Sequence, residues 1–314
     1  MILYVLFYLA NVYILVYIMT FLLYGWGGWI GGQLLALLDA TEIDYKKGAA
    51  RLENVADVER EIVEIAPTHV ITFAGRTSGK IGDKEYTTID YLEQPGKFAE
   101  NVRDNLFAPI MLANLAKKHG FHLTYLGTGC IFQFDEAHPF GQEINGFDES
   151  ALPNFFGSGY SVVKGYTDQL MHQYADTVLN VRIRMPITPD YSKRNFITKI
   201  LTYPKVCSVP NSMTVLPELL PLLLDMIQKK TTGTINLTNP GLVSHNEILE
   251  MYKELVDPEF TWSNFSIEEQ NAILAAGRSN NYLDTTRLST LYPQVRNIKD
   301  AIREIILEMR DIPK

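Results

Sequence analysis

The sequence predicts an α/β fold in which a doubly wound parallel sheet is followed by a smaller C-terminal α/β lobe. Two observations predict it. Short runs of β-branched and aromatic residues alternate with helical periodicity through residue 184, which is typical of a parallel sheet with right-handed crossovers. In addition, 314 residues, of which 46% are hydrophobic, suffice for a sizeable core in one large domain or two small ones.

Charge and cysteine content exclude some classes of protein. The net charge of −8 argues against a general nucleic-acid binder, which needs a basic surface. The sequence has two cysteines, Cys130 and Cys207. They imply no disulfide framework, and a reducing, cytoplasmic compartment fits. We expect no metal site.

Residues 1–18 are almost wholly apolar and have the length of most of a membrane span or of the apolar part of a signal peptide. However, no Lys or Arg precedes them, no small-residue cleavage site follows, and they adjoin the expected strand Phe21–Tyr24 without a linker. We therefore expect an extension outside the fold, which naturally begins at Met19, rather than a membrane anchor.

The strand Phe21–Tyr24 is followed by Gly25, Gly28 and Gly31, at the spacing G-x-x-G-x-x-G, and by helical periodicity over residues 29–38. In a dinucleotide-binding turn, the first glycine permits the sharp turn, the second lets the backbone approach a pyrophosphate, and the third lets the helix pack on the strand. The helix N-terminus then offers free N–H groups to phosphates. The alternative is a glycine-rich turn without a ligand.

Basic residues follow the expected second strand, residues 42–45. Lys46, Lys47 and Arg51 suit the 2′-phosphate of NADPH better than the free ribose of NADH. The alternative is that they are solvated surface charges.

The remaining elements complete the alternation. We expect a helix over 54–65, a strand over 68–73 ending at Ala74 and Gly75, a polar loop over 76–96, a helix over 98–118 kinked by Pro109, a strand over 121–126, a helix over 158–173 and a strand over 178–184. Beyond Pro186 the alternation fades into helical pieces (195–201, 217–229, 245–255, 298–309) and short strands (206–209, 234–237). We therefore assign residues 19–186 to a Rossmann domain that binds NADP and residues 187–314 mainly to a substrate-binding lobe, with a cleft between them.

Tyr160 and Lys164 are four residues apart on the predicted helix 158–173, so they share one face. A nearby ammonium favours the phenolate and lowers the tyrosine pKa, which makes the phenol a usable proton donor or acceptor. As an isolated pattern, the pair is usually only a surface pair.

Thr128 stands at the tip of the fourth strand, where ligands of such sheets bind, and its hydroxyl can bond a carbonyl oxygen. The alternative is a turn threonine that ties down its own backbone. Cys130, two residues later, points to the same side if the chain stays extended. Its thiol could remove a proton beside a carbonyl, or be a buried small hydrophobe.

These residues resemble those of the extended short-chain dehydrogenase/reductases. Within them, the sequence is similar to the bifunctional UDP-4-keto-6-deoxy-D-glucose 3,5-epimerase/4-reductases of UDP-L-rhamnose synthesis, relatives of dTDP-4-dehydrorhamnose reductase. Besides the glycine turn, Thr128 and Tyr160-x-x-x-Lys164, the resembling segments are 51–54, 128–132, 184–187, 194–199, 211–216, 239–247 and 278–281. Two features depart from the family: residues 1–18 have no counterpart, and the loop between Gly75 and Asn105 is longer, which leaves its substrate contacts open.

The resemblance implies NADPH as the cofactor. It would be held by Gly25, Trp26, Gly27, Gly28, Trp29, Ile30, Gly31, Arg51, Ala74, Gly75, Asn105, Tyr160, Lys164 and Met185.

The resemblance also implies the chemistry. Thr128, Tyr160 and Lys164 would form the reductase triad. Tyr160 would protonate the C4 oxygen, and Lys164 would lower the tyrosine pKa and hold the nicotinamide ribose. Cys130 would act as the base at C3 and C5, with Lys199 as the acid; alternatively, Lys199 is a solvent-facing lysine on a helix. The candidates for holding the UDP-sugar, each equally readable as an ordinary polar or packing residue, are Thr128, Asn195, Asn211, Met213, Arg278 and Asn281.

The main hypothesis is therefore an NADPH-dependent enzyme that makes UDP-L-rhamnose from a UDP-4-keto-6-deoxy sugar supplied by an upstream 4,6-dehydratase. Cys130 favours it, because a plain 4-reductase does not need that thiol. The alternatives are a 4-reductase alone, of the dTDP-4-dehydrorhamnose reductase type, and a non-catalytic NADP-binding regulatory subunit. The sequence leaves open whether the nucleotide of the substrate is UDP or dTDP and whether the protein forms a homodimer.

Overall fold

The computed structural model of the protein describes residues 5–9, 12–16 and 19–312. Its centre is a six-stranded sheet with the order β12-β9-β8-β5-β3-β4, in which every neighbouring pair is parallel. The strands are β3 (Phe21–Tyr24), β4 (Tyr45–Lys47), β5 (His69–Thr72), β8 (His122–Thr128), β9 (Val178–Ile183) and β12 (Gly233–Asn236). The strand order reverses between β3 and β5, and ligands of such sheets bind outside the carboxyl ends of the strands at this point.

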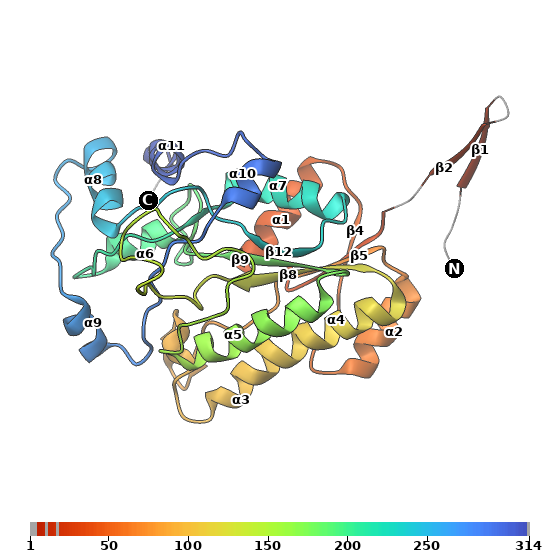
Figure 1. Ribbon diagram of the computed structural model, residues 1–314, viewed down its shortest axis with the longest axis horizontal. Helices are drawn as coiled ribbons and strands as arrows, with labels where there is room; N and C mark the ends of the chain where they lie inside the picture. Colours follow the sequence, from red (N-terminus) through yellow and green to blue (C-terminus); the bar gives the residue numbers. More distant parts are fainter. Residues whose placement is uncertain (1–4, 10–11, 17–18, 313–314) are drawn as a thin grey trace.

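Helices cover both faces of the sheet, as the alternation predicts (Figure 1). One face carries α1 (Trp29–Ala40), α7 (Leu216–Gln228) and α10 (Thr286–Leu291). The other carries α2 (Val55–Ile65), α4 (Ala108–His119) and α5 (Gly159–Met171), which η3 (His172–Tyr174) extends. The doubly wound α/β fold is confirmed.

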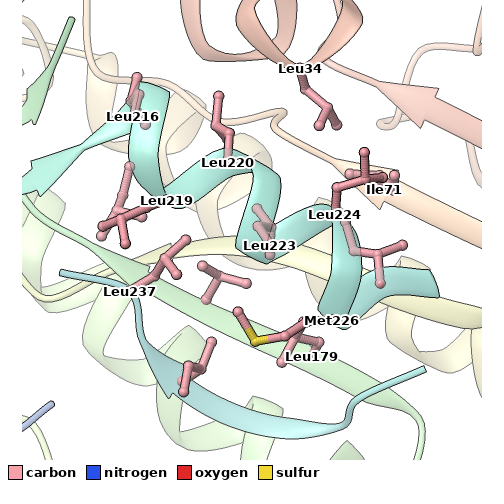
Figure 2. Close-up of a cluster of buried hydrophobic side chains, with 14 of the residues drawn as sticks. Leu34, Ile71, Leu179, Leu216, Leu219, Leu220, Leu223, Leu224, Met226 and Leu237 are labelled. Carbon is pink, nitrogen blue, oxygen red and sulfur yellow. The ribbon is translucent and has the colours of Figure 1, made fainter. Parts of the chain in front are cut away.

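The largest core lies between α7 and the sheet. Leu219, Leu220, Leu223 and Leu224 recur at helical spacing and belong to one buried cluster with Leu34 of α1 and Leu179 of β9 (Figure 2). Complete burial of such a side chain stabilises the fold by roughly 1.5–3 kcal/mol. This packing anchors α7, although it follows Pro186, to the central sheet.

The C-terminal lobe has a second core, formed by α6 (Phe196–Thr202), α8 (His245–Leu255) and α11 (Ile298–Arg310) with the short parallel pair β10 (Pro186–Ile187) and β11 (Thr214–Val215). A capping box begins α8, where Ser244 and Glu247 each bond the other's backbone N–H. The small helix α9 (Ile267–Ile273) begins with the same device.

Several details differ from the sequence expectations. The strand expected over 206–209 is reduced to an isolated bridge between Val206 and Asn264. The strand expected in the lobe near residue 234 is β12, the edge strand of the main sheet, because it pairs with β9. The expected loop 76–96 instead contains the hairpin β6 (Gly79–Ile81) and β7 (Lys84–Tyr86) and the turn η1 (Ile89–Tyr91). The expected helix 98–118 forms as one helical run of α3 (Lys97–Val102), the π-helical turn η2 (Arg103–Phe107) and α4 (Ala108–His119), with helical backbone at both junctions. The widened turn directly precedes Pro109, which has no N–H for a bond within the helix.

Of residues 1–18, the structure describes only the backbone of β1 (Val5–Leu9) and β2 (Val12–Val16), which pair antiparallel with each other. The expectation that this segment is an extension beginning before Met19 stays a prediction, since residues 1–4, 10–11 and 17–18 lie outside the described residues. No helix in the described ranges is long and apolar enough to cross a membrane.

Candidate active site

A cavity of about 810 Å³ opens at the carboxyl ends of the central strands. The sheet side contributes Gly25, Ala74 and Thr128, and the C-terminal lobe contributes Phe196 and Lys199. The cavity therefore lies between the main sheet and the lobe, where a substrate cleft is expected.

The glycine turn forms one wall of the cavity. Gly25 has φ +72°, and a Cβ there would lie 2.4 Å from the backbone N of Ala74; a Cβ on Gly31 would lie 2.4 Å from the carbonyl oxygen of Gly25. Both positions therefore require glycine. Gly28 begins α1 without a side-chain cap, so the backbone N–H groups of that first turn are open to an anion.

The neighbouring wall is the tip of β5. Ala74, Gly75 and Asn105 all line the cavity. The buried side chain of Asn105 accepts from the backbone N of Arg76 at 2.9 Å and donates to its carbonyl oxygen at 2.8 Å. This pair of bonds fixes the loop after Gly75 in the shape that borders the cavity.

Two residues predicted to hold the cofactor lie outside the cavity lining. Trp26 points outward, donating from Nε1 to the carbonyl oxygen of Gly48 at 3.0 Å beneath the ammonium of Lys47. The exposed guanidinium of Arg51 pairs with Glu53 at 3.4 Å. The remaining predicted cofactor residues, Gly27, Gly28, Trp29, Ile30, Gly31, Tyr160, Lys164 and Met185, line the cavity.

Thr128, Cys130 and Tyr160 meet at the centre of the cavity. The Thr128 hydroxyl accepts from the backbone N of Cys130 at 3.0 Å, which is the turn-threonine role, and it lies near enough to the Tyr160 hydroxyl to affect the pKa of that phenol. Ser161 ties the start of α5 to this loop by donating to the carbonyl oxygen of Cys130 at 2.7 Å. Burial raises the pKa of Tyr160 and the charge of Cys130 adds to this, whereas the hydroxyl of Thr128 lowers it.

Lys164 lines the cavity, and its ammonium is directed at β8. Its ammonium donates to the Tyr125 hydroxyl at 2.5 Å and to the carbonyl oxygen of Leu126 at 3.4 Å. Burial lowers the pKa of Lys164 to about 7. The ammonium retains one N–H for a ligand in the cavity.

Three cations line the opposite side of the cavity: Arg194, Lys199 and Arg278. Burial lowers the pKa of Lys199, and the charges of Arg194 and Arg278 lower it further. Lys199 is therefore not the solvent-facing lysine of the alternative interpretation. Among the described residues, Lys199 has no ion pair with a carboxylate, and two guanidinium groups lie near it. The three cations are therefore suited to binding an anion.

Four predicted substrate ligands lie fully buried outside the cavity. Asn195 caps α6 and donates to the carbonyl oxygens of Thr188 and Asp190, while Met213 belongs to the lobe core.

Asn211 accepts from Arg184 at 2.7 Å, and Asn281 donates to the carbonyl oxygens of Gly129 and Phe132. The side-chain amides of Asn195 and Asn211 are engaged in the protein, as is Nδ2 of Asn281, whereas the buried Oδ1 of Asn281 has no hydrogen-bond partner among the described residues. Asn195, Asn211, Met213 and Asn281 do not line the cavity, whereas Arg278 does, and a contact of the four with the substrate stays a prediction.

Several residues that line the cavity were not predicted from the sequence, among them Thr88, Tyr203, His245 and Asn280. Burial lowers the pKa of His245 to about 4, so its imidazole is neutral at neutral pH. These residues come from segments far apart in the chain, and no local pattern distinguishes them.

Fold and cavity together are those of a dinucleotide-binding oxidoreductase of the short-chain dehydrogenase/reductase class. No protein-family model matches the chain. A UDP-rhamnose synthase from Acanthamoeba polyphaga mimivirus is 51% identical over 93% of this chain and 99% of its own, with a TM-score of 0.88 for its crystal structure. A bifunctional dTDP-4-dehydrorhamnose 3,5-epimerase/dTDP-4-dehydrorhamnose reductase from Arabidopsis thaliana is 43% identical over 92% of this chain and 93% of its own.

At lower identity, the NADP complex of a dTDP-4-dehydrorhamnose reductase from Bacillus anthracis shares the fold, with 20% identity over 92% of this chain and 99% of its own and a TM-score of 0.75. The chain belongs to the family of nucleotide-sugar epimerase/reductases that includes the viral synthase and the Arabidopsis enzyme. The resemblance stated from the motifs is thereby confirmed.

Proposed function

We propose that this protein converts UDP-4-keto-6-deoxy-D-glucose to UDP-L-rhamnose by 3,5-epimerisation and NADPH-dependent reduction at C4. The observation that carries the proposal is that Cys130 shares one cavity with Thr128, Tyr160 and Lys164, and that Lys199 faces the same cavity. A base, an acid and a reductase triad can therefore act on one sugar ring.

The cofactor would lie along the glycine turn, since Gly25 and Gly31 leave open the space that side chains would fill. The N-terminus of α1 would hold its pyrophosphate, and Lys164 would donate its remaining N–H to the nicotinamide ribose. Bound NADPH supplies the hydride for C4. Arg51, Lys46 and Lys47 would meet a 2′-phosphate at the rim of the site, outside the cavity lining.

In the reduction, Thr128 and Tyr160 would donate hydrogen bonds to the C4 oxygen. The raised pKa of Tyr160 keeps the phenol protonated, so it is a donor before the transfer. As negative charge develops on the C4 oxygen, the Tyr160 proton passes to it.

In the epimerisation, the Cys130 thiolate would remove the proton from C5, and then from C3, because the 4-ketone acidifies both positions. The electron pair of each broken C–H bond moves into the enolate, and Lys199 returns a proton to the opposite face of the ring. The lowered pKa of Lys199 makes its ammonium a stronger acid than an ordinary lysine. Arg194 and Arg278, beside Lys199, would hold the diphosphate on C1. Since C1 and C5 are both bonded to the ring oxygen, C5 would then lie near Lys199.

The test incubates the full chain with NADPH and UDP-4-keto-6-deoxy-D-glucose in heavy water and follows NADPH absorbance and deuterium at C3 and C5. The proposal expects both signals, and Cys130→Ala should abolish deuterium entry. Cys207→Ala is the control, since the other thiol of the chain also lines the cavity, and this variant should exchange deuterium normally.

NADPH oxidation without deuterium exchange in the wild type would instead establish a 4-reductase alone. If the wild type gives no NADPH oxidation and no exchange, the protein is a non-catalytic NADP-binding subunit. Replacing UDP by dTDP in the same assay decides the nucleotide.

Two wider expectations belong to this proposal. A 4-keto-6-deoxy sugar is the product of a 4,6-dehydration, so an upstream dehydratase supplies the substrate. A free catalytic thiol needs a reducing compartment such as the cytoplasm. A homodimer stays a prediction, which the molar mass from light scattering tests.

A further inference from the structure

Two of the three cations that line the cavity opposite the glycine turn, Arg194 and Arg278, are held by residues 77–92. This segment contains β6, β7 and η1 and is distant from both arginines in the sequence. Asp90 accepts from Nη2 of Arg278 at 2.6 Å and from the backbone N of Ala276 at 3.0 Å. Ser78 accepts from Nη1 of Arg194 at 2.8 Å. Ser78 and Thr88 of the segment line the cavity themselves.

These contacts matter because the two arginines come from separate parts of the lobe. Arg194 precedes α6, and Arg278 lies in the extended stretch after α9. Nη1 of Arg278 donates to the carbonyl oxygen of Ala276 at 2.7 Å and Nη2 donates to Asp90. A guanidinium so fixed still has three of its five N–H donors for an anion.

The charge of Asp90 also favours this position of Arg278. Arg194, Lys199 and Arg278 repel one another, and Asp90 is the ion-pair partner of Arg278. Burial raises the pKa of Asp90, but hydrogen bonds from Thr88 and Arg278 outweigh it, so the pKa is lowered and the carboxylate stays ionised. Without it, Arg278 would swing away from the other cations.

We propose that Asp90 is a positioning residue for substrate binding: it sets the guanidinium of Arg278 toward the diphosphate of the nucleotide-sugar, while Ser78 does the same for Arg194. The inference rests on the proposed function and extends it. The 77–92 segment, expected as a surface loop, becomes the support of the diphosphate site.

The experiment measures UDP binding to the full chain by calorimetry. Asp90→Asn keeps the shape of the side chain but leaves too few acceptors for Thr88, Ala276 and Arg278. We expect UDP affinity to fall by roughly 5–20-fold, the loss of a charge-assisted hydrogen bond, with NADPH affinity unchanged. Ser78→Ala, at an exposed bond that folding does not need, should weaken UDP binding by about 2–3-fold.

Whether Asp90→Asn weakens or tightens UDP binding tells a positioning role from a purely electrostatic one. If Asp90 acted only as a negative charge near an anion, Asp90→Asn would tighten UDP binding, and that result, or an unchanged affinity, overturns the positioning role. In an Arg278→Ala background, Asp90→Asn should cause no further loss, because it acts through that arginine. Asp225→Asn is the matched control. The carboxylate of Asp225, on α7, likewise pairs with a cation and accepts from a hydroxyl, here those of Lys229 and Tyr292, and UDP affinity should not change in this variant.

A wild-type chain that does not bind UDP would reject the proposed function together with this inference. A wild-type chain that binds UDP, with variants that bind it equally well, would reject the inference alone.

Discussion

Tyr160 has its hydroxyl at the centre of the site, within hydrogen-bonding reach of Thr128 and close to Cys130. The two half-reactions use different proton carriers, so they should separate by mutation. In Tyr160→Phe, the rate of NADPH oxidation should fall by about 10²–10⁴-fold, as for the loss of a general acid. Deuterium entry at C3 and C5 should persist, because Cys130 and Lys199 are untouched. Loss of both signals would show that the phenol also serves the epimerisation.

Tyr125 accepts a hydrogen bond from the Lys164 ammonium and presents its ring at 4.6 Å to the same nitrogen. The other charged groups near Lys164 are Asp168 of α5 and Cys130, which raise its pKa against burial, and Arg182 of β9 is paired with Asp168.

In Tyr125→Phe, the ring stays and the acceptor is lost, so the charged form of Lys164 is less stable and its pKa should fall below about 7. If reduction needs the ammonium, activity should decline at lower pH than in the wild type. The pH profile of NADPH oxidation measures the shift. Tyr252→Phe, which removes a buried hydroxyl from the lobe core, should leave the profile in place.

At the level of elements, the turn between β3 and α1 offers a matched pair of glycines. A Cβ on Gly31 meets the carbonyl of Gly25 at 2.4 Å, whereas a Cβ on Gly32, the next residue of the same helix, meets nothing within 4 Å. Gly31→Ala should therefore lower the free energy of unfolding by about 1–3 kcal/mol through overpacking and weaken NADPH binding. Gly32→Ala should raise stability by about 0.5–1 kcal/mol. Urea unfolding and fluorescence titration with NADPH measure both, and equal behaviour of the two variants would contradict the role given to the turn.

The loop that carries Thr128 and Cys130 is held in place by a different element. Asn281 donates to the carbonyl oxygens of Gly129 and Phe132 at 2.9 and 3.0 Å. Asn281→Ala should lower kcat by about 10-fold or more, since small misplacements of reacting groups are costly, with little change in the affinity for UDP. A change in UDP affinity alone would instead support the direct substrate contact that the motif suggested.

For the molecule as a whole, acid stability should depend on two buried histidines at the start of neighbouring strands of the central sheet. His69 and His122 lie 5.7 Å apart on neighbouring strands. Burial lowers the pKa of His69 to about 4, and the charges of His122 and Lys230 lower it further; burial also lowers the pKa of His122.

The unfolded chain binds these protons more readily, so the stabilisation is complete above pH ~6.5 and is lost as pH falls toward the folded-state pKa values. For His69 alone the loss is on the order of 3 kcal/mol between pH ~6.5 and ~4. Urea unfolding at a series of pH values should show this slope, and His69→Phe should flatten it. An identical slope in the variant would assign the acid sensitivity to other groups.

The sequence alone determined the local features of this protein. Strand and helix periodicity located the elements of the main sheet, and glycine spacing located the turn at the end of β3, because these signals depend on residues within one turn or one strand of each other. Thr128, Tyr160 and Lys164, which line one cavity, were likewise recognisable from short motifs as the proposed triad.

Tertiary structure decided the rest. The same motifs could not tell Arg278, which lines the cavity, from Asn281, which is buried in its wall. Asp90 lies 188 residues from Arg278, and Asn281 lies 152 residues from Gly129. Whether such pairs meet depends on how the lobe packs against the sheet, and no pattern of neighbouring residues encodes that packing.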